Sequence, residues 1–117
     1  MAENLNCNVE GSVCFDADSC EKYGRLYDWD AAKKACPSGW HLPSDAEWTA
    51  LENYVGGSSV AGTKLKSTSG WYNNGNGMDE VGFSALPGGH GTDYNSFRSA
   101  GNIGNWWSAT EHDANYA

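Results

Sequence analysis

The chain has 117 residues, of which 15 are acidic and seven are basic, so its net charge at pH 7 is −8. This length predicts one domain with a core of its own, and the negative charge disfavours nucleic acid and anionic membranes as partners. No apolar run of about 18 residues is present to insert into a membrane, and no charged-then-apolar segment of the signal-peptide kind opens the chain.

The composition combines 15 glycines with six tryptophans and six tyrosines, while only 19% of the residues are charged. Flexible glycine and large rings together favour a loop-rich fold packed around aromatic side chains. We therefore expect long loops and short regular elements.

Residues 1–20 contain three of the four cysteines. Cys14 and Cys20 bracket a short polar loop, and the sequence predicts a disulfide between them, because no cysteine pair has the two-residue spacing of a zinc or redox motif. The alternative is that all four thiols are free, as in a cytosolic protein.

A short strand is predicted over residues 23–27, followed by a helix over 29–36 that Asp28 caps and Pro37 stops. Acidic residues open this helix and lysines close it, in agreement with the helix dipole. Cys36 shares the apolar face of the helix and is expected to point into the core.

The clearest helix signal lies at 44–55, where Ser44 and Glu47 form a capping box. The pair of glycines at 56–57 supplies the left-handed residue that ends the helix. One face is apolar, and it carries Trp48, Leu51 and Val55.

A short, marginal helix is predicted up to residue 65, with a serine at 58 or 59 as its cap. Beyond it, residues 67–104 lose helical periodicity and read as loops with very short strands. Alternation of apolar and polar residues predicts strands over 81–87 and 105–111.

Four blocks of this sequence resemble the Fibrobacter succinogenes major paralogous domain, a repeated module of bacterial surface and secreted proteins. They are Tyr-Gly-Arg-Leu-Tyr at 23–27, residues 35–48 with Gly-Trp-His-Leu-Pro-Ser at 39–44, Gly-Phe-Ser-Ala-Leu-Pro-Gly-Gly at 82–89, and Trp-Trp-Ser-Ala-Thr-Glu at 106–111. The resemblance implies an extracellular or cell-surface location in bacteria, with the signal outside this chain.

The run from Trp29 to Glu47 is similar to the first two elements of C-type lectin-like domains, a fold shared with the formylglycine-generating enzymes. This resemblance implies an α+β fold, with two helices on a small, irregular antiparallel sheet and a long loop region. The enzymes of that group act through cysteines in their C-terminal part, and this chain has none after Cys36.

Members of the resembled family continue to a last strand and cysteine that residues 1–117 lack, so we expect a fragment of a longer protein with an open sheet edge that invites oligomerisation. In the lectin-like pattern the missing cysteine pairs with the one at Cys36. Family members commonly carry tyrosine at the position of Cys7, so a Cys7–Cys36 bridge is a hypothesis, and an unpaired Cys36 is the alternative.

The sequence offers little for catalysis. His41, His90 and His112 lie far apart and in no metal-binding spacing, and no Gly-x-Ser-x-Gly elbow or phosphate-binding loop is present. We expect no enzymatic activity.

Two candidate ligand sites remain. Hard cations take carboxylate and amide oxygens from flexible loops, so the loop over 73–80 is a possible calcium site, with a solvated turn as the alternative. Its candidate ligands are Asn74, Asn76, Asp79 and Glu80, and the aspartates at 16 and 18 form a weaker alternative.

Exposed rings bind sugar faces or apolar side chains. The candidates are Trp71, Tyr72, Tyr94 and Trp106, with Phe97 nearby, whereas Trp40, Trp48 and Trp107 are expected to fill the core. The expected function is therefore non-catalytic binding of carbohydrate or a surface protein. The alternatives are an enzyme or enzyme remnant of the formylglycine-generating type and a structural spacer repeat.

Overall fold

The computed structural model describes residues 3–16, 18–93 and 96–112. In chain order the elements are β1 (Ser12–Val13), α1 (Ser19–Tyr23), β2 (Leu26–Tyr27), α2 (Trp29–Lys34), α3 (Asp45–Tyr54), α4 (Ser58–Leu65), β3 (His90–Asp93) and β4 (Ser96–Arg98). Within the described residues these are four helices and two small sheets, which confirms the predicted α+β class. None of the helices found there is long and apolar enough to cross a membrane.

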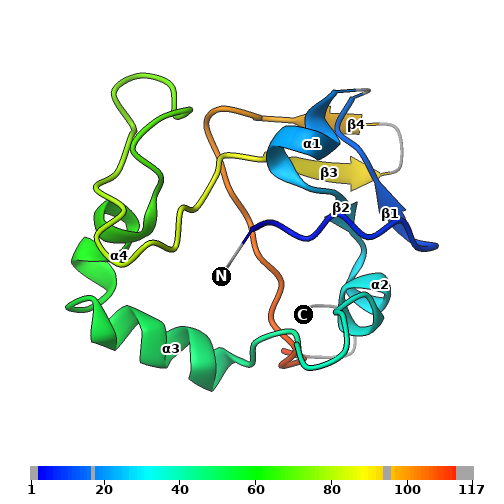
Figure 1. Cartoon of the computed structure of the whole chain (residues 1–117), viewed down its shortest axis with the longest axis horizontal. Helices are drawn as coiled ribbons and strands as arrows, with labels where there is room; N and C mark the ends of the chain where they lie inside the picture. The colour runs from blue at the N-terminus through cyan, green and yellow to red at the C-terminus, as the bar shows by residue number, and fades with distance from the viewer. Residues whose placement is uncertain (1–2, 17, 94–95, 113–117) are drawn as a thin grey trace.

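Both sheets are antiparallel pairs. In the first, Ser12 of β1 faces Tyr27 of β2, and in the second, His90 of β3 faces Arg98 of β4, with an irregularity further along the pair. Two isolated parallel bridges, at 66/85 and 89/104, tie later loops to the rest of the chain. Figure 1 shows the helices and sheets arranged around the rim of the molecule, while residues near 105–110 run down its middle.

Two predicted helix caps are confirmed, and the third is wrong. Ser44 and Glu47 form both hydrogen bonds of the capping box at the start of α3, and Asp28 accepts the amide of Ala31 at the start of α2. α2 ends at Lys34, before the predicted residue 36, and α4 begins at Ser58 with Gly57, not a serine, at its N-cap.

The two predicted strands over 81–87 and 105–111 are wrong, since the first region contributes only one bridged residue, Ala85, and the second contributes none. In the first region both carboxylate oxygens of Asp79 bond Ser84, at 2.7 Å to its amide and 2.5 Å to its hydroxyl. Asp79 and Ser84 both have positive φ. The side-chain bonds therefore curl this segment into a turn instead of an extended strand.

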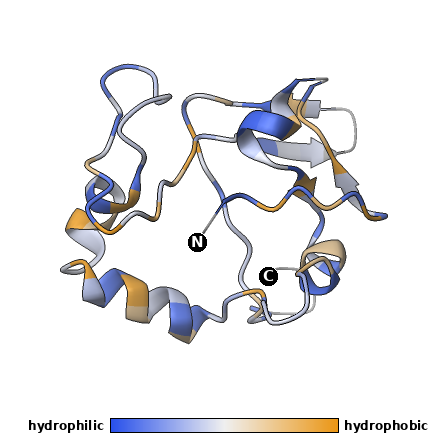
Figure 2. Cartoon of the chain, viewed as in Figure 1, coloured by the Kyte–Doolittle hydropathy of each residue, from blue (hydrophilic) through white to orange (hydrophobic). Residues whose placement is uncertain are grey.

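The buried apolar residues are mostly small: Cys20, Ala31, Ala32, Ala35, Val55, Ala61 and Ala85, together with the fully buried Pro87. α3 has no buried residue between its ends, and Figure 2 shows hydrophilic and hydrophobic stretches along its length. The expectation that Trp40 and Trp107 fill the core is wrong, because they are 62% and 40% exposed. The large rings instead surround an open space in the molecule.

Candidate binding site

A central hollow of about 1660 Å³ opens among the described residues. Its walls come from the N-terminal segment, the β1–β2 sheet, the turn between α2 and α3, the start of α3, and the segments 83–92 and 103–112. Its aromatic lining residues are Tyr23, Tyr27, Trp40, Trp48, Phe83, Phe97, Trp106 and Trp107. A hollow with this lining is suited to binding apolar or flat ligand surfaces.

An aromatic ladder of Trp48, Phe83 and Trp106 forms one wall of the hollow. The Trp48 and Phe83 ring centres are 6.1 Å apart, those of Phe83 and Trp106 are 6.4 Å apart, and both pairs meet edge to face. This geometry is favourable for aromatic pairs. The ladder therefore fixes three segments that are distant in the sequence, and it leaves Trp106 36% exposed at the hollow.

Tryptophan indoles hold the segment 104–110 against the opposite elements. Trp29 Nε1 donates to the carbonyl oxygen of Ser108 at 2.7 Å, and Trp48 Nε1 donates to that of Trp107 at 3.2 Å. Trp107 Nε1 donates in turn to the carbonyl oxygen of Tyr27 at 2.6 Å. The segment is thus anchored to α2, α3 and β2 by side chains and not by a strand ladder.

Two hydrogen bonds at the far end of this segment, one of them to a side chain, complete its attachment. The Ala109 amide donates to the carbonyl oxygen of Pro43 at 2.8 Å, and Thr110 Oγ1 accepts the Asp45 amide at 3.0 Å. Among the described residues, no hydrogen bond is formed by the amides of residues 106–108. These three donors lie on a segment that lines the hollow.

Among the described residues, the charged groups at the hollow are mostly acidic: Glu3, Asp28, Asp45 and Glu47 line it, and Arg25 is the one basic residue there apart from histidine. His41 Nε2 lies 2.6 Å from Glu47 Oε1, and both side chains are exposed. The Ser44 amide, with His41 second, holds the pKa of Glu47 below its usual value. Because Glu47 completes the capping box, the main role of the His41–Glu47 pair is to stabilise the start of α3.

Two further titratable side chains line the hollow. Burial raises the pKa of Tyr27, whose hydroxyl accepts the Cys7 amide at 2.8 Å and contacts the carbonyl oxygens of Leu5 and Cys7. His90 Nδ1 is buried without a hydrogen-bond partner in the described part of the chain. A polar group brought by a ligand or by water would satisfy that nitrogen.

Of the predicted ligand-binding rings, those in the described residues do not all line the hollow. Trp106 lines the hollow, whereas Trp71 and Tyr72 do not. The Trp71 indole donates to Ser67 Oγ and to the Ala85 carbonyl oxygen, both at 3.1 Å. Tyr72 is 65% exposed, and Tyr94 lies outside the described residues.

The predicted calcium loop braces the end of α4. The amides of Met78, Asp79 and Glu80 donate to the carbonyl oxygens of Thr63, Lys66 and Lys64 at 2.7, 3.1 and 2.8 Å, respectively. These carbonyls lie at the end of a helix and have few partners within it. The amides of the loop therefore act as a cap for α4.

The side chains of this loop are turned to different partners. Asn76 Oδ1 accepts the Trp71 amide at 3.0 Å, and Glu80 pairs with Lys64 at 3.1 Å. The Ser84 hydroxyl, followed by its amide, lowers the pKa of Asp79, and Asn74 is exposed. Three of the four predicted ligands thus have protein partners of their own, and no group of three or more His, Cys, Asp or Glu placed for a metal ion occurs in the described ranges. The calcium site stays a prediction.

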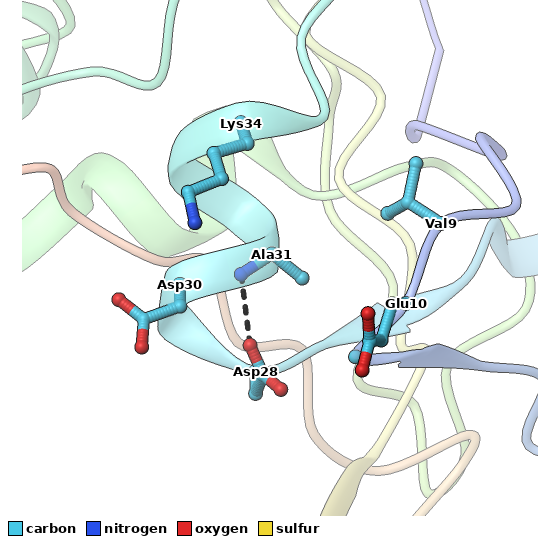
Figure 3. Close-up of a pocket in the computed structure, with 7 residues that line it drawn as sticks. Val9, Glu10, Asp28, Asp30, Ala31 and Lys34 are labelled. Carbon is cyan, nitrogen blue, oxygen red and sulfur yellow. Dashed lines mark hydrogen bonds between the residues drawn. The ribbon is translucent and has the colours of Figure 1, made fainter.

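A smaller pocket of about 380 Å³ lies between the N-terminal segment and α2 (Figure 3). Glu10 reaches it from one side and Asp30 and Lys34 from the helix, while the Asp28 carboxylate caps the Ala31 amide at 2.8 Å. The lining is polar and charged. It therefore lacks the aromatic surface that distinguishes the central hollow.

The Cys14–Cys20 disulfide is formed, as predicted. Cys7 and Cys36 are both free and half-buried, so the hypothetical Cys7–Cys36 bridge is not formed in this structure. Cys36 lines the hollow instead of lying in the core.

Sequence reasoning missed most of the hollow. It assigned Trp48 to the core and placed none of Tyr27, Trp29 and Phe83 at a binding site. The sequence did hold one signal for exposed rings. It has many tryptophans and few apolar helix positions to cover them, so a chain of this size cannot bury every tryptophan.

Comparison with known protein families identifies the family of this chain. The family model described as the Fibrobacter succinogenes major domain matches residues 1–117. No curated protein sequence and no solved structure matches the chain.

Proposed function

The chain belongs to the Fibrobacter succinogenes major domain family, and on this premise we propose that it is a non-catalytic binding module whose ligand enters the central hollow. The observation that carries the proposal is the hollow itself, of about 1660 Å³ and lined by aromatic residues. Aromatic surfaces of this kind dominate the energetics of binding sites.

The favoured ligand is an extended segment of another protein. Within 106–108 the amides have no partner among the described residues, and on an extended chain alternate amides of this stretch can pair with the backbone of an added strand. The lining carboxylates outnumber the single arginine, which favours a partner with lysine or arginine beside its apolar side chains. A second copy of the chain that supplies such a segment would give an oligomer.

Carbohydrate is the second candidate, and the exposed ring of Trp106 favours it. Aromatic faces stack on sugar rings, and the neighbouring Trp107 is 40% exposed. Calcium at the 73–80 loop is part of this second candidate only, because a calcium-dependent lectin needs the metal to hold the sugar.

The proposal places the protein on the outside of a bacterial cell, as a surface or secreted protein. The Cys14–Cys20 bridge supports this location, because disulfides persist mainly in oxidising compartments. We also propose the C-type lectin-like group as its fold, on the basis of the similar run from Trp29 to Glu47. An enzyme remnant of that group, or a spacer repeat, remains the alternative.

The test measures binding of the chain to an array of extended peptides with basic or acidic flanks, and to a broad glycan array with calcium or with a chelator. We expect basic-flanked apolar peptides to bind, and Trp106→Ala to weaken that binding by about tenfold. The matched control is Tyr72→Ala, which removes an exposed ring outside the hollow and is expected to bind normally.

Each other outcome identifies a different function. Glycan binding that resists the chelator and is lost in Trp106→Ala would make carbohydrate the ligand of the hollow. Glycan binding that the chelator abolishes would move the site to the 73–80 loop. Arrays that remain blank at high protein concentration would refute the binding function and favour a spacer.

A further inference from the structure

The Cys14–Cys20 disulfide lies against a cationic side chain. Arg25 Nη1 is 3.4 Å from Cys14 Sγ and 3.8 Å from Cys20 Sγ, within hydrogen-bonding range of both sulfurs. Its position is fixed by Ser12, since Arg25 Nε donates to Ser12 Oγ at 2.9 Å and Nη2 to the Ser12 carbonyl oxygen at 3.4 Å. The guanidinium is thus held beside the bridge by β1.

The two sulfurs differ in exposure. Cys20 is buried, with 9% of its surface exposed, whereas Cys14 is half-buried in the loop before α1. An incoming thiolate attacks the more accessible sulfur of a disulfide, and the other sulfur leaves as a thiolate. A neighbouring arginine stabilises a thiolate and makes it a better leaving group.

Other charged groups near the bridge have weaker effects. Asp16 accepts the amides of Asp18 and Ser19 at 3.1 and 2.9 Å, which places a negative charge in the same loop. Asp16, Asp18, Glu21 and Lys22 are all exposed, so water screens them. Tyr27 of the neighbouring strand bonds the N-terminal segment. Arg25 is the cation in direct contact with the sulfurs.

We propose that the Cys14–Cys20 bridge is a thiol-exchange site at which Arg25 stabilises the departing sulfur. A thiolate of an external dithiol attacks Cys14 Sγ, the S–S bond breaks, and its electron pair leaves on Cys20 Sγ beside the guanidinium. The second thiol of the dithiol then attacks its own sulfur in the mixed disulfide and releases Cys14. The dithiol is oxidised to a disulfide, the bridge is reduced, and the two protons of the dithiol balance the two new thiols.

The bridged loop contacts the wall of the hollow, so reduction of the bridge would also affect that wall. Phe15, in the bridged loop, packs on Phe97 of β4 with ring centres 5.8 Å apart, and Phe97 lines the hollow. The exchange site is therefore connected to the surface proposed for binding, although its chemistry is independent of any ligand.

The test equilibrates the protein with mixtures of reduced and oxidised dithiothreitol, in a Cys7→Ser, Cys36→Ser background that leaves one cysteine pair. The bridged fraction is measured by alkylation and mass spectrometry. Arg25→Gln is expected to shift the equilibrium about tenfold toward the disulfide, or about 30 mV, and to slow the exchange. Arg98→Gln, an exposed charge-matched control, is expected to behave like the parent. Equal equilibrium constants for Arg25→Gln and the parent would overturn the proposal.

Two further measurements separate this role from a structural one. Arg25→Lys keeps the positive charge, so its equilibrium constant with dithiothreitol is expected to lie between those of the parent and Arg25→Gln. In the reduced parent, ultraviolet absorbance of the thiolate is followed against pH, and this readout does not require a variant to fold. One thiol is expected to have a lower pKa than free cysteine, whose pKa is about 8.5. Two thiols that both ionise at the ordinary pH would refute the proposal.

Discussion

Replacement of Gly77 by alanine tests how the 73–80 loop supports α4. A Cβ atom at Gly77 would lie 2.6 Å from the Cβ of Lys66 and 2.7 Å from the Thr63 carbonyl oxygen, and would press on the Lys66 carbonyl oxygen as well. Two of these neighbours are backbone atoms, which cannot rotate away as the end of a flexible side chain can. The loop must therefore move away from the helix.

The expected cost combines overpacking with weakened capping. Overpacking costs about 1–3 kcal/mol, and each weakened hydrogen bond from the loop to α4 costs about 0.5–1.5 kcal/mol. Alanine lowers the entropy of the unfolded chain, which offsets about 0.4–1 kcal/mol. We expect Gly77→Ala to lower the free energy of unfolding by about 2 kcal/mol.

Gly62 provides a matched control on the same helix. A Cβ atom there would meet no atom within 4 Å, so Gly62→Ala is expected to stabilise the protein by about 0.5–1 kcal/mol through helix propensity. Urea denaturation followed by circular dichroism measures both variants. If Gly77→Ala proves as stable as Gly62→Ala, the reasoning that this loop caps α4 by close backbone approach is wrong.

Three further predictions concern the side-chain contacts. Trp29→Phe keeps a ring but removes the indole bond to Ser108, so urea denaturation should show a loss of about 1 kcal/mol; an unchanged midpoint would contradict the anchoring role. Because Ser84 lowers the pKa of Asp79 below 3.8, the ionised carboxylate contributes stability that is fully present above pH 3.8 and is lost as the pH falls through the lower folded value. Asp79→Asn should therefore flatten the fall of Tm with acid, and an unchanged pH profile would argue against this linkage. Serine at both positions of the Cys14–Cys20 bridge, whose sequence separation is 6, should cost about 2 kcal/mol of stability in urea, and a variant as stable as the parent would contradict the loop-entropy estimate.

The sequence predicted the features that depend on neighbouring residues. The capping box at Ser44 and the cap at Asp28 are local hydrogen bonds, and so the starts of α2 and α3 were found. The disulfide also closes a short loop. The family resemblance, which rests on four blocks of sequence, is confirmed by a match over residues 1–117.

The failures arise where distant residues override the local pattern. Alternation predicted a strand over 105–111, yet carbonyl groups there are taken by the indoles of Trp29 and Trp48, and the Trp29 bond joins residues 79 positions apart. The hollow could not be predicted from the sequence for the same reason, since the aromatic ladder joins three segments that are distant in the chain. The bonds between Asp79 and Ser84 were also not predicted, and the calcium site at 73–80 stays a prediction.

The indole anchors of segment 104–110 also determine how this part of the protein can change in evolution. A strand held by a backbone ladder can accept an extra residue as a bulge. Here Trp107 donates through its side chain and accepts through its carbonyl, and the next carbonyl accepts from Trp29. An insertion or deletion within this segment would displace several anchors at once. We therefore expect variation in length to concentrate in other loops and the spacing within this segment to be preserved.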